Sequence, residues 1–152
     1  MELADKVAVI TGASMGIGEA IAKLFLERGA RIVLLSRDAN RAESARARIG
    51  QPDRTLALSC DVRNREEIDR VLGLTLHHYG RIDIWVNNAG FGMADSAADM
   101  DMSVCRDLFD TNYFGAVASM QAVIPIMRQQ GGGAIINVSS VAAFLPRGSY
   151  SA

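Results

Sequence analysis

The sequence predicts an α/β fold, in which helices cover both faces of a parallel β-sheet. Three observations lead to this fold class. Short continuous runs of apolar residues, many of them β-branched, recur along the chain and are typical of strands buried on both faces. Segments with helical spacing of apolar residues separate these runs. The connecting loops are short. Parallel strands need a crossover connection between them, and the helical segments supply it.

Length, composition and charge indicate one domain over residues 1–152 and exclude several classes of protein. The chain has 152 residues, of which 49% are hydrophobic, so it can bury a sizeable core. A net charge of −1 argues against a nucleic-acid partner. Because the sequence has neither an apolar run of roughly 20 residues nor a signal peptide, we expect no membrane span and a cytoplasmic protein.

The cysteines and histidines lack the spacing of a metal site. Cys60 and Cys105 stand alone in the sequence, so we expect reduced thiols in the core. His77 and His78 lie at a predicted helix end, where solvation explains them better than metal binding. The sequence therefore predicts no metal.

The first strand, loop and helix organise the rest of the chain. Residues 6–10 predict a buried strand, and residues 17–28 have apolar side chains at helical spacing before a stop at Gly29. The glycine loop, residues 11–18, joins them. Backbone N–H groups at a helix start have no internal partner and the helix dipole favours an anion, so this loop predicts a phosphate site. The alternative is a glycine-rich turn that binds nothing.

Two motifs resemble those of the short-chain dehydrogenase/reductase family. The loop reads T-G-x-x-x-G-x-G and matches the family pattern at every fixed position, and Asn87-Asn88-Ala89-Gly90 is a second family signature. The resemblance implies a Rossmann-type doubly wound sheet of strand order 3-2-1-4-5. It also implies a cofactor lying across the carboxyl ends of the strands, near the switch point between the first and fourth strands.

The end of the second strand bears on the choice of dinucleotide. Residues 31–35 predict this strand, and Ser36 and Arg37 follow where a dinucleotide fold meets the adenosine ribose. A hydroxyl and a guanidinium suit a 2′-phosphate, which favours NADP. NAD is the alternative, because Asp38 could bind a free ribose hydroxyl and Met15 stands where many NADP-preferring members have a basic residue. Arg37 could also be an ordinary solvated charge.

The middle of the chain adds two more strands and two helices. Residues 40–49 and 65–79 predict helices, while residues 55–60 and 82–86 predict strands. The family resemblance assigns Asp61 to the adenine amino group and packs Val62 on the ring. An alternative for Asp61 is a helix cap or loop turn.

Beyond the fourth strand, the resemblance implies that Asn88, Ala89 and Gly90 wall the cofactor pocket. Residues 102–109 predict a helix that continues, after a bend, through residues 111–127. The second part is apolar nearly all round and needs cover on both sides, so we expect a homo-oligomer formed through it. Pro125 should bend it or weaken one turn. By resemblance Asn112 holds a water in a proton relay, and the alternative is a helix-terminal hydrogen bond.

The last segment contains the remaining catalytic residues that the resemblance implies. Residues 134–138 predict the fifth strand, Ser140 would face the substrate oxygen, and Tyr150 would be the family's catalytic tyrosine unless it merely packs. The family's lysine would fall just past the last residue. We therefore expect a fold truncated after the fifth strand, C-terminally incomplete, and by itself inactive or nearly so.

The family resemblance implies reversible hydride transfer between a nicotinamide cofactor and a small-molecule carbonyl or secondary alcohol. The alternative is a non-catalytic dinucleotide-binding fragment that lacks the lysine and the substrate-capping segment. The predicted cofactor-binding residues are Gly12, Ser14, Met15, Gly16, Ile17, Gly18, Ser36, Arg37, Asp61, Val62, Asn88, Ala89 and Gly90. The predicted catalytic residues are Asn112, Ser140 and Tyr150.

Overall fold

In the described part of the chain, five parallel strands form one sheet in the order β3-β2-β1-β4-β5, which confirms the predicted fold class and strand order. The computed structural model describes residues 3–93, 96 and 98–141. Ile10 of β1 lies opposite Leu34 of β2 on one side and Val86 of β4 on the other. The strands are β1 Val7–Ile10, β2 Arg31–Ser36, β3 Thr55–Ser59, β4 Ile84–Asn87 and β5 Ala134–Asn137.

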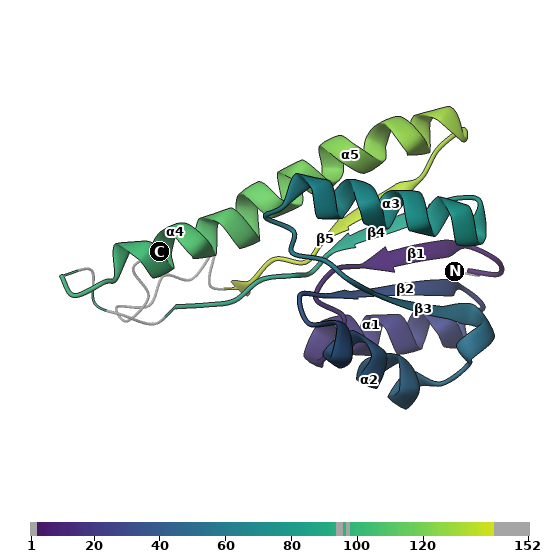
Figure 1. Cartoon of the computed structure of the whole chain (residues 1–152), viewed down its shortest axis with the longest axis horizontal. Helices are drawn as coiled ribbons and strands as arrows, with labels where there is room; N and C mark the ends of the chain where they lie inside the picture. Colours follow the sequence, from purple (N-terminus) through teal and green to yellow (C-terminus); the bar gives the residue numbers. More distant parts are fainter. Residues whose placement is uncertain (1–2, 94–95, 97, 142–152) are drawn as a thin grey trace.

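Helices cover both faces of the sheet (Figure 1). In the view of Figure 1, α1 and α2 lie below the sheet and α3 and α5 above it. Asp38 and Asn64 cap α2 and α3, since each side chain accepts hydrogen bonds from two backbone N–H groups of the first turn. The helices are α1 Gly16–Glu27, α2 Ala39–Ile49, α3 Arg65–Tyr79, α4 Met102–Phe109 and α5 Gly115–Gln129, with a 3-10 turn at Pro52–Arg54.

The alternation of side chains along the strands divides the core into two halves. Ala8 and Ile10 face α1 on one side of β1, whereas Val9 joins Trp85 on the side of α3 and α5. Ile10, Val9 and Trp85 are completely buried. Burial on both faces explains why the strands read as continuous apolar runs in the sequence.

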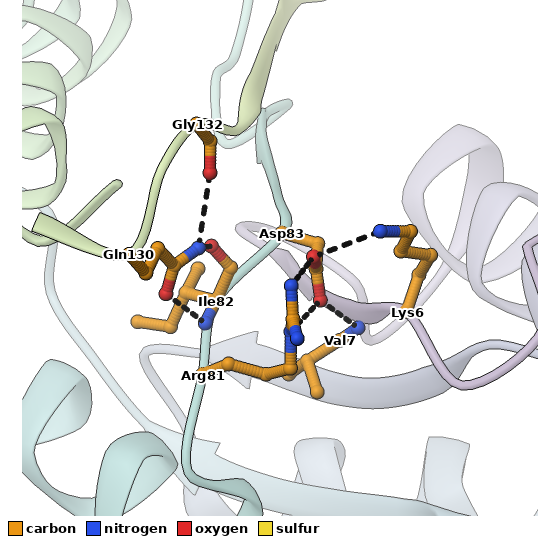
Figure 2. Close-up of polar contacts among 7 residues, drawn as sticks. All are labelled: Lys6, Val7, Arg81, Ile82, Asp83, Gln130 and Gly132. Atoms are coloured by element: carbon orange, nitrogen blue, oxygen red, sulfur yellow. Dashed lines mark hydrogen bonds and ion pairs between the residues drawn. The ribbon is translucent and has the colours of Figure 1, made fainter. Parts of the chain in front are cut away.

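Strand β4 begins at Ile84, so the predicted start at residue 82 is wrong. The Gln130 side chain binds both backbone polar groups of Ile82. Its Oε1 accepts from the Ile82 N–H at 3.2 Å, and its Nε2 donates to the Ile82 carbonyl. The same Nε2 donates to the carbonyl of Gly132 at 3.2 Å, so one amide closes the turn before β5 (Figure 2).

Next to this turn the Asp83 carboxylate joins the starts of β1 and β4 (Figure 2). It accepts from the Val7 N–H at 3.0 Å, from Arg81 Nε and Nη2 at 2.8 and 2.7 Å, and from Lys6 Nζ at 3.3 Å. Burial acts to raise the pKa of Asp83, but these hydrogen bonds together outweigh it and lower the pKa below its usual value. Asp83 is therefore ionised and joins the amino-terminal ends of β1 and β4, at the opposite end of these strands from the glycine loop.

The predicted long helix of residues 102–127 exists, and its interruption is a π-helical turn at Asp110–Phe114 that joins α4 to α5. The α5 helix runs through Pro125 to Gln129. One face of α5 is buried, whereas Phe109 and Phe114 are 48% and 56% exposed. Within the described part of the chain, no helix has both the length and the apolar character to cross a membrane.

Candidate functional site

The glycine loop is held against the end of β4 by side chains of both segments. The Asn88 amide donates to the carbonyls of Thr11 and Gly12 at 2.9 and 3.1 Å. In return, the Thr11 hydroxyl oxygen accepts from the backbone N–H groups of Asn88 and Ala89, each at 2.9 Å. This arrangement, which we call the Asn88 clamp, consists of Thr11, Gly12, Asn88 and Ala89.

Two glycines of the loop are required by this clamp. Gly12 has φ +64, and a Cβ there would lie 2.9 Å from the Cα of Ala89. A Cβ on Gly18 would lie 2.5 Å from the Asn88 Nδ2 and 2.5 Å from the Gly12 carbonyl oxygen. The close approach of loop, helix and strand therefore excludes side chains at both positions.

The start of α1 lacks the side-chain cap that the starts of the other helices after loops have. Side chains of Asp38, Asn64 and Asp101 cap α2, α3 and α4. Among the described residues no side chain caps α1, which begins after Met15. Its first N–H groups, next to the clamped loop, are left to bind an anion, which a helix N-terminus favours.

A cavity of about 380 Å³ lies beside this loop, at the carboxyl ends of the strands. Eight of the predicted cofactor-binding residues line it: Gly12, Ser14, Met15, Ser36, Arg37, Val62, Ala89 and Gly90. Among the described residues, five more line it: Asp38, Arg41, Cys60, Phe91 and Thr111. The topology thus brings segments from four loops together at the switch point between β1 and β4.

At the end of β2 the cavity carries more positive than negative charge. Of the described charged residues, Arg37 and Arg41 line it together with one carboxylate, that of Asp38. Asp38 Oδ1 already accepts from the N–H groups of Asn40 and Arg41 at 2.8 and 3.1 Å as the cap of α2. The Ser36 oxygen accepts from the Asp38 N–H at 3.3 Å, which leaves its hydroxyl proton available to a ligand.

Asp61 lies after β3, as predicted, but its carboxylate is paired with Arg63. Arg63 donates to both Asp61 oxygens, with Nη2 at 2.7 Å from Oδ2, and reaches Asp107 of α4 at 3.2 Å. The hydrogen bond from Arg63 is the main cause that lowers the pKa of Asp61. Asn64 rather than Asp61 caps α3, and Val62 is buried in the cavity wall.

The π-helical turn places Asn112 against the loop that follows β4. Its Nδ2 donates to the Phe91 carbonyl at 2.8 Å and its Oδ1 accepts from the Phe91 N–H at 3.1 Å. A Cβ on Gly90 would lie 2.9 Å from that Oδ1. Helical turns of this kind recur at functional sites. The neighbouring Thr111 lies in the cavity wall, and its buried hydroxyl has no hydrogen-bond partner among the described residues.

Several predicted residues lie outside the cavity wall. Gly16 and Ile17 are exposed at the start of α1, and Gly18 and Asn88 serve the clamp beneath it. Ser140 is exposed and follows β5, whereas Tyr150 lies outside the described residues. Within the described ranges, no group of three or more His, Cys, Asp or Glu side chains could hold a metal ion.

Sequence reasoning missed Arg41, Cys60, Phe91 and Thr111 as parts of the wall. Arg41 had a signal, because it lies only four residues after Arg37 in the same segment after β2. The sequence contains no comparable signal for Phe91 and Thr111, whose positions depend on how the π-helical turn lies against the loop after β4.

Comparison with known proteins gives consistent matches over most of the chain. A family model described as short chain dehydrogenase matches residues 6–152. An uncharacterized oxidoreductase of Staphylococcus epidermidis is 39% identical over 142 residues, which cover 93% of this chain and 61% of that protein. A similar protein of Staphylococcus aureus strain MW2 is 35% identical with the same coverage. The chain thus spans 61% of the length of these relatives.

Two solved structures share the fold. A short-chain dehydrogenase from Streptomyces avermitilis superimposes with a TM-score of 0.89 and 35% identity, over 97% of this chain and 54% of that one. A 3-ketoacyl-(acyl-carrier-protein) reductase from Brucella melitensis, complexed with NADH, gives a TM-score of 0.93 and 32% identity, over 99% of this chain and 63% of that one.

Proposed function

This chain belongs to the short-chain dehydrogenase family, and from that premise we propose that it binds a nicotinamide dinucleotide in the cavity beside the glycine loop. The proposed reaction is reversible hydride transfer between the nicotinamide and a carbonyl or secondary alcohol. The observation that carries the proposal is the uncapped start of α1, held by the Asn88 clamp at the edge of the cavity. The similar Brucella reductase, which was solved with NADH, supports the cofactor class.

The residues present fit such a cofactor. Glycines at positions 12 and 18 let the backbone approach closely, and the free N–H groups of α1 would bind the pyrophosphate. Arg37, Arg41 and Ser36 supply donors where the adenosine ribose would lie. Because Asp38 already caps α2, the balance of charge favours a 2′-phosphate, and we propose NADP with NAD as the alternative.

The bound nicotinamide would supply the hydride acceptor or donor. Ser140 would donate a hydrogen bond to the substrate oxygen as charge develops on it. Tyr150 would give or take the hydroxyl proton, and nearby positive charge must lower its pKa from the usual value near 10 for this to occur at neutral pH. Asn112 would hold a water, because two bonds to Phe91 leave its amide one N–H and one oxygen lone pair.

Exposed aromatic side chains at the end of α4 and in the π-helical turn support a second proposal, a homo-oligomer formed through the helix of residues 111–127. Phe109, Tyr113 and Phe114 are 48%, 58% and 56% exposed, and they lie within six residues of each other. Large aromatic side chains are enriched in protein interfaces and contribute much of their binding energy. A second copy of the same helix, packed against this face, would bury them.

Fluorescence titration of the purified protein with NADPH and with NADH tests the cofactor proposal. We expect both nucleotides to bind, with NADPH bound more tightly. Arg37→Ala and Arg41→Ala should each weaken NADPH binding by about tenfold while changing the Kd for NADH by less than about threefold. If neither nucleotide binds, the proposed function is refuted. If Arg37→Ala and Arg41→Ala weaken the binding of NADPH and NADH equally, the assignment of a 2′-phosphate is refuted.

A panel of ketones, aldehydes and secondary alcohols then tests for hydride transfer, with nicotinamide absorbance as the readout. Turnover that Ser140→Ala abolishes would support the oxidoreductase. Nucleotide binding without turnover of any class would instead favour the alternative, in which residues 1–152 by themselves bind a dinucleotide without catalysis.

A further inference from the structure

The far half of the glycine loop is held by a residue of a different helix. Arg48, near the end of α2, donates from Nη2 to the carbonyl of Ser14 at 2.9 Å. Its guanidinium also forms a two-point pair with Glu19 of α1, with Nε at 2.9 Å from Oε1 and Nη2 at 2.8 Å from Oε2. One side chain thus connects the loop, the first turn of α1 and helix α2.

This contact complements the Asn88 clamp, which acts at the other end of the loop. The clamp binds the carbonyls of Thr11 and Gly12, and Ala13 donates its N–H to the Leu35 carbonyl at 2.9 Å. Beyond Ala13 the loop turns into the uncapped start of α1. Arg48 therefore restrains the part of the loop that directly precedes the free N–H groups.

The geometry of a peptide unit links the Ser14 carbonyl to the ligand side of the loop. The described residues contain no cis peptide, so the Ser14 C=O and the Met15 N–H point in opposite directions. With the carbonyl turned to Arg48, the Met15 N–H points away from α2. Ser14 and Met15 both line the cavity, so the orientation of this peptide determines which backbone group a ligand meets there.

Glu19 serves as the anchor for the guanidinium. Its side chain is 23% exposed, less than the 53% of Arg48, and the hydrogen bond from Arg48 is the main cause that lowers the pKa of Glu19. A guanidinium held at two points by a carboxylate has a fixed plane, which orients its three remaining N–H groups. One of them, on Nη2, donates to the Ser14 carbonyl.

We propose that Arg48 is a positioning residue for the dinucleotide, which sets its affinity by holding the Ser14–Met15 peptide. The inference rests on the proposed dinucleotide site. Because this peptide directly precedes the free N–H groups of α1, which would bind the pyrophosphate that both nucleotides share, the effect should be the same for NADPH and NADH. That feature separates Arg48 from Arg37 and Arg41, whose loss should affect NADPH alone.

The test is fluorescence titration of the full protein and its variants with NADPH and NADH. Arg48→Gln should raise the Kd for both nucleotides by about tenfold, the scale of one lost hydrogen bond from a charged donor. Arg48→Lys should recover part of the loss. The matched control is Arg46→Gln, because Arg46 lies on the same helix and bonds a carboxylate and two carbonyls away from the loop. It should leave both Kd values within about twofold of wild type.

A double variant excludes a charge effect. In Arg48→Gln the carboxylate of Glu19 is left unpaired near the phosphates and could repel them. The Glu19→Gln/Arg48→Gln variant has no such charge, and we expect it to stay about tenfold weaker than wild type. Recovery of wild-type affinity would overturn the positioning role.

Two other results would also refute this inference. If the wild type binds normally and Arg48→Gln leaves the affinity unchanged, the role of Arg48 is refuted and the proposed function stands. An equal loss of affinity in Arg46→Gln would have the same meaning. A wild type that binds neither nucleotide would overturn both this inference and the proposed function.

Discussion

The carboxylate of Asp83 should contribute a large part of the stability of the sheet, and Asp83→Ala removes it. Its side chain is 7% exposed and accepts from the buried N–H of Val7. Without it this amide has no acceptor, which costs about 1–3 kcal/mol. Lys6 and Arg81 are about half exposed, so each ion pair adds only about 0.2–1 kcal/mol. We therefore expect a loss of roughly 1.5–5 kcal/mol.

Urea denaturation at pH 7, with the slope compared between variants, measures this loss. The matched control is Asp69→Ala, because Asp69 pairs with Arg65 on the exposed face of α3. Asp69→Ala should change the free energy of unfolding by less than about 0.5 kcal/mol. A loss below about 1 kcal/mol for Asp83→Ala, or an equal loss in both variants, would refute the assignment.

The pH dependence provides a second check. The pKa of Asp83 is lowered in the folded state, so its ionised form contributes stability that is fully present above the unfolded pKa of about 3.9. As the pH falls from there through the lowered pKa, the proton binds the unfolded chain first and the advantage of wild type over Asp83→Ala shrinks. A difference that stays constant from pH 7 to pH 3 would contradict an ionised, paired carboxylate.

Other positions give independent tests. Gly73→Ala should raise stability by about 0.5–1 kcal/mol, because among the described atoms an added Cβ in α3 meets nothing within 4 Å. Gly18→Ala should abolish nucleotide binding in titrations, because its Cβ would lie 2.5 Å from a loop carbonyl. Ser119→Ala should stabilise by about 1 kcal/mol in urea, since its buried hydroxyl has no partner among the described residues. Burial raises the pKa of the Cys60 thiol to about 11, so mass spectrometry should show iodoacetamide at pH 8 modifying Cys105 before Cys60.

The sequence predicted the sheet well because its strands are buried on both faces. Continuous apolar runs are the direct signature of such burial, and the observed β2 and β3 lie close to their predicted limits. The start of β4 could not be predicted from local residues, since Ile82 is buried like a strand residue but its backbone binds the side chain of Gln130, 48 positions away. The π-helical turn at residues 110–114 was expected only as a bend.

The candidate site was predictable where a local motif requires a local conformation. Steric contacts exclude a side chain at Gly12 and Gly18, and the spacing of the glycines in the sequence already indicates these two positions. Asn88 was expected to wall the pocket, but its side chain reaches back to the glycine loop instead. The direction of such a side chain depends on which strand lies beside it. Arg48 was not singled out for the same reason, since its contacts depend on how α2 packs against α1.

The Asn88 clamp also dictates when the site can exist during synthesis of the chain. Its hydrogen bonds join residues 76 to 78 positions apart. At about 5–20 residues per second, the glycine loop leaves the peptidyl-transfer centre roughly 4–15 seconds before Asn88 is made. Throughout that interval β1 lacks its neighbour β4 and the loop lacks its clamp. A dinucleotide can therefore stabilise only a chain in which β4 has already docked, and the nascent first half must avoid aggregation without help from its ligand.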